Sequence, residues 1–241
     1  MQFLVFLYFY FVANVVALDF PSYVKKCSAK DPELNKCLEN RANEVIPHLV
    51  KGDRILGIPV LSPVKIPKLD FQDGGFKLSL TDVHFDNFKD FTLSDVIFDL
   101  QGGNIQYTLN SKYLNFTSNY ALNDAQIMRR NVFGRGRFRM VLVNNAMRYK
   151  TGVELSRKHG GTYIRGLNAD LKLESEKVYF YFENVRDNSA QDAADTNIFL
   201  QEHSRAIFEE IRPGIERLVL SYIEAVVTAI NEKIPVETTI P

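Results

Sequence analysis

The chain has 241 residues, 46% of them hydrophobic, and its 29 basic and 29 acidic side chains leave no net charge at neutral pH. A surface that binds nucleic acid needs an excess of Lys and Arg, so we expect no nucleic acid partner. The length is enough to bury a sizeable core, and no Pro-, Gly- or Ser-rich linker divides the chain. We therefore expect residues 18–241 to form a single domain.

The first segment, residues 1–17, contains no charged side chain. Val15 and Ala17 stand at the −3 and −1 positions of a small-residue cleavage site, which predicts a signal peptide cut after Ala17. An uncleaved signal anchor and a buried helix are the alternatives, although seventeen residues are at the short limit for crossing a bilayer. We expect a secreted, extracellular protein with no stable membrane insertion.

Both cysteines of the chain, Cys27 and Cys37, follow this segment closely. They could form half of a metal site, a redox pair or a disulfide, or remain free thiols. An oxidising compartment favours the disulfide. A redox motif would need CxxC, and a zinc site would need further ligands, whereas the four histidines are scattered singly. The sequence therefore predicts a Cys27–Cys37 disulfide, no metal and no cofactor.

Residues 32–50 carry apolar side chains at helical spacing, and Asp31 followed by Pro32 is typical of a helix start. In the next segment Pro59, Pro63 and Pro67 recur every four residues. Prolines that dense exclude a helix interior and a central strand, so an extended connector is expected there.

Apolar and polar side chains alternate from residue 76 to residue 185, which is typical of strands with one buried face. Short turns such as the one at residues 158–161 indicate a long antiparallel meander. Asn115, Phe116 and Thr117 form an N-glycosylation sequon, which is a short motif that can also go unused. If Asn115 carries a glycan, it faces solvent, and the alternation turns Leu114 and Phe116 inward.

The last region, residues 196–233, has an apolar stripe and a charged stripe at helical spacing. Pro213 removes one backbone donor and is expected to kink this helix. A helix of this length and one antiparallel sheet bury their apolar faces together when the sheet curls around the helix. The fold class is therefore α+β, with a long C-terminal helix wrapped by a highly curved antiparallel sheet.

No nucleophile elbow, P-loop or EF-hand motif occurs in the sequence. Five arginines between residues 129 and 139 could form a polyanion site, but arginines on alternate positions of a strand are more simply a solvated face. The protein is therefore not expected to be an enzyme.

Several stretches, in this order, resemble the insect takeout and juvenile-hormone-binding proteins: CSAKDPELNKCLENRANEVIPHLVKG, IPVLSPVKIPKLDF, GRGRFRMVLVNNAM, VYFYFENV and FLQEHSRAIFEEIRPGIERLV. The resemblance covers essentially the whole mature chain. It implies an elongated tubular fold related to lipid-binding proteins, with an apolar cavity between helix and sheet. It also implies the family's N-terminal disulfide at Cys27 and Cys37. The second disulfide of the haemolymph carriers is missing, which makes the chain more takeout-like.

We therefore expect a monomeric, non-enzymatic carrier whose partner is a hydrophobic small molecule or lipid, such as a juvenile-hormone-like terpenoid, a fatty acid or a quinone-like lipid. The alternative is a secreted signalling or structural protein that acts through a protein partner, and an esterase is the third possibility. The expected ligand-binding residues are the inward-facing apolar side chains of the two helices and the sheet. They are Leu34, Leu38, Phe138, Met140, Phe180, Phe182, Ile207, Ile211, Leu218 and Tyr222.

Overall fold

The computed structural model describes residues 23–73, 76–127, 129–158, 160–185 and 190–241. The predicted signal peptide, residues 1–17, lies outside the described residues. In chain order, the first elements are helix α1 (Leu34–Leu49), strands β1 (Val64–Asp73) and β2 (Phe76–Asp86), the short 3-10 helix η1 (Phe88–Asp90) and strand β3 (Thr92–Asp99). Three long strands follow, β4 (Asn104–Ile127), β5 (Arg130–Lys158) and β6 (Gly161–Phe182), and then helices α2 (Ala190–Glu202), α3 (Ser204–Lys233) and α4 (Val236–Thr239).

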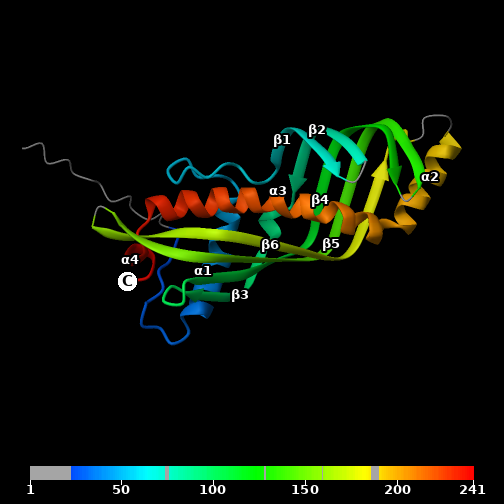
Figure 1. The fold of residues 1–241 in the computed structure, drawn as a ribbon. Helices are drawn as coiled ribbons and strands as arrows, with labels where there is room; N and C mark the ends of the chain where they lie inside the picture. The colour runs from blue at the N-terminus through cyan, green and yellow to red at the C-terminus, as the bar shows by residue number, and fades with distance from the viewer. Residues whose placement is uncertain (1–22, 74–75, 128, 159, 186–189) are drawn as a thin grey trace, which may run out of the picture.

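All six strands belong to one antiparallel sheet in the order β1-β2-β4-β5-β6. β3 also pairs with β4, so β2 and β3 share one edge of β4 end to end. The sheet curls around α3, which runs along the length of the molecule, while α1 lies near one end (Figure 1). This arrangement confirms the α+β fold predicted from the sequence.

The period of two in the sequence appears directly in the buried face of the long strands. On β5, Phe138, Met140 and Leu142 are buried, whereas Arg137 and Arg139 between them are exposed. The facing side of α3 buries Ile207, Phe208, Ile215 and Val219. The main core therefore lies between the concave face of the sheet and one face of this helix.

Three local expectations need correction. The first helix begins at Leu34 rather than at Pro32, because the Asp31 side chain accepts the Glu33 N–H at 2.8 Å in a turn before the helix. The connector ends at residue 63, and Pro67 lies inside strand β1. β1 is an edge strand, where the N–H that proline lacks costs no ladder hydrogen bond.

The third correction concerns the C-terminal helix, which is divided at His203 into α2 and α3 instead of running unbroken from residue 196 to residue 233. The Nδ1 atom of His203 lies 2.8 Å from the Phe199 carbonyl oxygen, so the side chain takes part in the bonding at the end of α2. Pro213 is tolerated inside α3 on its exposed side.

Side chains of α2 and α3 cover the outer edge of β6. Asn197 accepts the Phe182 N–H and donates to the Phe182 carbonyl, both at 2.8 Å. Gln201 does the same with Phe180 N–H and Val178 carbonyl, each at 3.1 Å. Further along the strand, Arg205 donates to the carbonyls of Ser175 and Glu176, and Glu216 accepts the Leu173 N–H. These helix side chains thus replace the hydrogen bonds that a further strand would make.

Candidate functional site

An apolar cavity of about 390 Å³ lies at the α1 end of the molecule. Its walls come from the segment before α1, from α1 itself, from η1, β3 and β4, and from the C-terminal half of α3. Aliphatic and aromatic side chains make up nearly all of this lining. The cavity therefore offers an apolar environment to a molecule that fits it.

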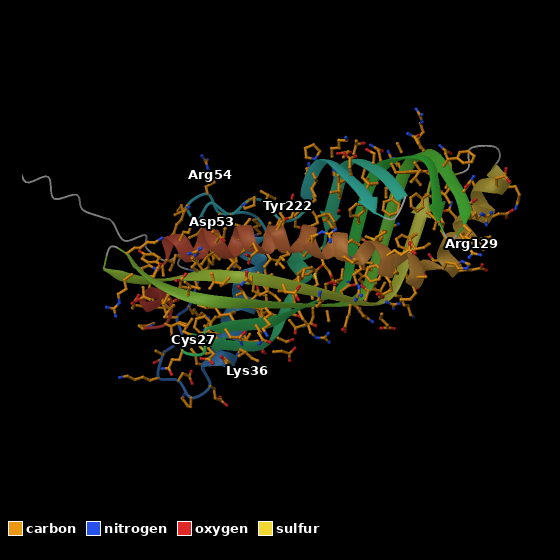
Figure 2. The ribbon with its side chains drawn as sticks, in the orientation of Figure 1. Cys27, Lys36, Asp53, Arg54, Arg129 and Tyr222 are labelled. Atoms are coloured by element: carbon orange, nitrogen blue, oxygen red, sulfur yellow. A yellow bond between two sulfur atoms is a disulfide. The ribbon has the colours of Figure 1, made fainter. Side chains whose placement is uncertain are left out.

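The two helices face each other across the cavity with matching apolar stripes. α1 contributes residues at steps of three and four, which places them on one face of the helix, and α3 does the same from Val219 onward. Tyr222, which is labelled on α3 in Figure 2, is one of these lining residues. The main residues of the two stripes are Leu38, Ala42, Val45, Ile46, Ile223 and Val226.

Tyr107 of β4 lines the cavity, and Tyr149 and Glu224 lie behind it. The Tyr107 ring stacks on that of Tyr149 with centroids 4.7 Å apart. The Tyr149 hydroxyl donates to Glu224 of α3 at 2.6 Å. Burial raises the pKa of both tyrosines well above the ordinary value, so both phenols are neutral. Tyr107 therefore brings a neutral phenol to this wall, backed by Tyr149.

The Cys27–Cys37 disulfide is present, with the two Cα atoms 6.0 Å apart. It joins the segment before α1 to the first turn of that helix. Cys27 is buried and lines the cavity, and its N–H donates to the Thr239 carbonyl at 3.3 Å. The disulfide therefore holds Val24, Lys25 and Cys27 in place as one wall of the cavity.

Two of the residues expected to bind ligand, Leu38 and Tyr222, lie in the cavity lining. Leu34 stands at the start of α1, outside the lining. The others lie in the main core, most of them toward the α2 end, where they pack against one another or against that core. They are Phe138, Met140, Phe180, Phe182, Ile207, Ile211 and Leu218.

Aromatic side chains fill the interior at that end. Phe138 and Phe182 are cross-strand partners with ring centroids 4.5 Å apart, and Phe116 packs on Phe138 at 5.5 Å. The contacts continue through Phe85 to Phe88, which lines the cavity. The packed rings thus border the cavity on its η1 side.

Residues that the sequence reasoning did not select also line the cavity, among them Arg41, Phe88, Phe91 and Tyr107. Arg41 could have been found, because it lies three residues after Leu38 and four before Val45, on the apolar face of a predicted helix. The residues from η1 and β4 could not, since their place depends on how β3 and β4 pair and on where α1 packs.

Asn115 lies on β4, between Leu114 and Phe116, which are 1% and 3% exposed. Asn115 itself is partly exposed, and its register partners are Asp86 and Val141. Its side chain therefore belongs to the outer face of the sheet, away from the cavity. Glycosylation of Asn115 stays a prediction.

Within the described ranges, no group of His, Cys, Asp and Glu side chains is arranged to hold a metal ion. The helices in this part of the chain also lack a stretch that is both long enough and apolar enough to span a membrane.

A match to the family described as haemolymph juvenile hormone binding protein covers residues 5–241. A protein of Schistocerca gregaria that is named for beta-carotene binding is 25% identical over 153 residues, which are 63% of this chain and 61% of the relative. The chain thus matches about three fifths of that relative's length. The crystal structure of Takeout 1 from Epiphyas postvittana superposes with a TM-score of 0.81 at 17% identity, over 89% of this chain and 98% of the other. At this identity the structural match shows a shared fold.

Proposed function

The chain belongs to the haemolymph juvenile hormone binding protein family, and we propose that it is a secreted, non-enzymatic carrier of a long apolar molecule. The cavity between α1 and the C-terminal half of α3 is the observation that carries this proposal. A ligand that enters it exchanges water for aliphatic and aromatic side chains, which stabilises the complex by about 25 cal/mol for each Å² of apolar surface removed from water.

Two further observations support the ligand class. The name of the Schistocerca gregaria relative refers to beta-carotene, which is a long terpenoid hydrocarbon. The lining is apolar on both helices, and Tyr107 and Tyr222 are the two tyrosines among its residues. A terpenoid, a fatty acid or a quinone-like lipid combines a long apolar body with few polar atoms and suits such a lining.

Secretion is supported by the sequence of residues 1–17 and by the pairing of Cys27 with Cys37. Disulfides of this kind form and persist in oxidising compartments. We therefore place the carrier outside the cell.

The test is to secrete the full chain from insect cells, purify it under native conditions, and identify bound small molecules by native mass spectrometry and solvent extraction. We expect a lipid of the proposed classes at close to one molecule per chain. The same lipid, incubated with fresh protein, is expected to be recovered unchanged, whereas hydrolysis would indicate an esterase. If no lipid co-purifies and added terpenoid, fatty acid and quinone probes do not bind, the carrier proposal is wrong and a protein partner becomes the better explanation.

A further inference from the structure

Arg41 is the exception on the apolar face of α1. It lines the cavity together with Leu38 and Val45, and it also lines a polar depression of about 630 Å³ on the adjoining surface. Asp31, Glu33, Lys36, Asn40 and Glu44 also border this depression. Arg41 therefore stands at the rim, where the apolar interior meets water.

The guanidinium of Arg41 is only partly satisfied. Its NH1 group donates to Glu44 at 2.8 Å, but its Nε–H is buried and has no hydrogen-bond partner among the described residues. Leaving a buried charged donor without a partner costs free energy that a suitable acceptor restores. The rim thus contains a hydrogen-bond donor, the Nε–H of the positively charged Arg41 guanidinium, that has no acceptor among the described residues.

Arg41 shares its acidic partner with a second basic side chain. Lys25, the other charged residue of the lining, pairs with the same carboxylate of Glu44 at 3.2 Å. Hydrogen bonds from Lys25 and Arg41 lower the pKa of Glu44, so its carboxylate is ionised at neutral pH. Two basic groups share one acidic group, and none of the acidic side chains in the described part of the chain lines the cavity. Glu44 is therefore shared between two bases, and the Nε–H of Arg41 stays available to a further acceptor.

We propose that Arg41 binds the carboxylate of a long-chain amphipathic acid, whose apolar tail occupies the cavity. The guanidinium fork is suited to a carboxylate, because it offers several N–H groups in one plane. The polar depression leaves the head group in contact with water, which reduces the cost of placing a charge beside an apolar lining. This inference rests on the proposed carrier function and names the class of its ligand.

The test compares palmitate with methyl palmitate, which has the same tail without the negative charge. Affinities of the full chain for both probes are measured by isothermal titration calorimetry. The variants are Arg41→Met, which keeps an unbranched apolar stem and removes the charged guanidinium, and Arg41→Lys, which keeps the charge. Arg54→Met is the control, because Arg54 is exposed and lies on the opposite side of α3 from Cys27 and Lys36 (Figure 2).

We expect the unmodified protein to bind palmitate more tightly than the ester by about tenfold, as for a charge-assisted hydrogen bond. Arg41→Met is expected to abolish this preference by weakening the binding of palmitate and not that of the ester. Arg41→Lys is expected to keep part of the preference. Arg54→Met is expected to leave the affinities for both probes unchanged. Circular dichroism melting confirms that each variant is folded.

If the unmodified protein binds acid and ester equally, or if Arg41→Met weakens both by the same factor, the anchoring role is wrong while the carrier function stands. If the unmodified protein binds neither probe, nor any terpenoid or quinone probe, the carrier function itself is wrong.

Discussion

Ala42 and Met140 both point into the molecule, but they have different surroundings. Ala42 faces the cavity from α1, whereas Met140 is 2% exposed and packs in the main core. A larger side chain at Ala42 has space to occupy, whereas a larger side chain at Met140 must displace its neighbours. Substitutions at these two positions can therefore distinguish a cavity that accepts a ligand from tightly packed core.

We expect Ala42→Phe to change the melting temperature by only a few degrees while weakening binding of a fluorescent fatty acid about tenfold, because the ring takes the ligand's place. Met140→Trp is the matched comparison and should lower the free energy of unfolding by about 1–3 kcal/mol through overpacking. Thermal melts and probe titration measure both effects. Strong destabilisation by Ala42→Phe would show that the cavity is closed in solution.

For single residues, the sequence predicts whether a side chain points inward better than it predicts which residues surround that side chain. The alternation along β5 and β6 correctly turns Phe138, Met140, Phe180 and Phe182 inward, because strand side chains have a period of two. Whether an inward side chain meets a partner or an empty space depends on residues brought together by strand register. This is why these residues lie among packed rings while Leu38 lies in the cavity.

At the scale of elements, the outer edge of β6 is hydrogen-bonded by side chains of the two helices that follow it in sequence, α2 and α3. Asn197 bonds both backbone groups of Phe182 and also donates to the Ala193 carbonyl at 3.0 Å. The side chain acts in place of a neighbouring strand at this point of the sheet edge.

Asn197→Ala removes these hydrogen bonds and leaves the Phe182 N–H and carbonyl without their partner. We expect a loss of about 1–3 kcal/mol in the free energy of unfolding, measured by urea denaturation. Gln191→Ala on the same helix is the control, because Gln191 is exposed and its hydrogen bond within the described residues goes to Asp195 of the same helix. Equal effects of the two substitutions would contradict the role of Asn197 at the edge.

Helix content and strand content are predictable for this chain, but the interruptions are not. Pro213 lies inside α3 on its exposed side, and the kink expected there stays a prediction. The break occurs at His203, where a side chain competes for the Phe199 carbonyl. Competition of this kind involves the packing of α2 against β6, which local sequence does not contain.

Over the whole molecule, the curled sheet around a long helix follows from the sequence and agrees with the Takeout 1 fold. The shared edge of β4 does not follow from it, because two short strands that pair with one long strand look like a simple meander in sequence. The single domain expected for residues 18–241 stays a prediction.

The Cys27–Cys37 disulfide joins the segment before α1, which lines the cavity, to α1 itself. Replacing both cysteines by alanine releases the segment that carries Val24 and Lys25 from α1. We expect a loss of about 3 kcal/mol in stability, because the loop closed by the disulfide is short, and weaker binding of a fluorescent fatty acid. Chemical denaturation and titration of the variant at a temperature where it is fully folded separate the two effects. Unchanged affinity in the folded variant would show that this segment does not form a working wall.

The ring contacts that run from Phe138 to Phe88 have a consequence for ligand selection. Phe88 and Phe91 border the cavity on the side where the interior is already full. A tail that starts at the α1 rim gains about 0.8 kcal/mol for each methylene group that it buries, until it reaches these rings. Beyond them, each added carbon must displace packed aromatic side chains or remain in water. The protein would then act as a molecular ruler, choosing among homologous lipids by chain length.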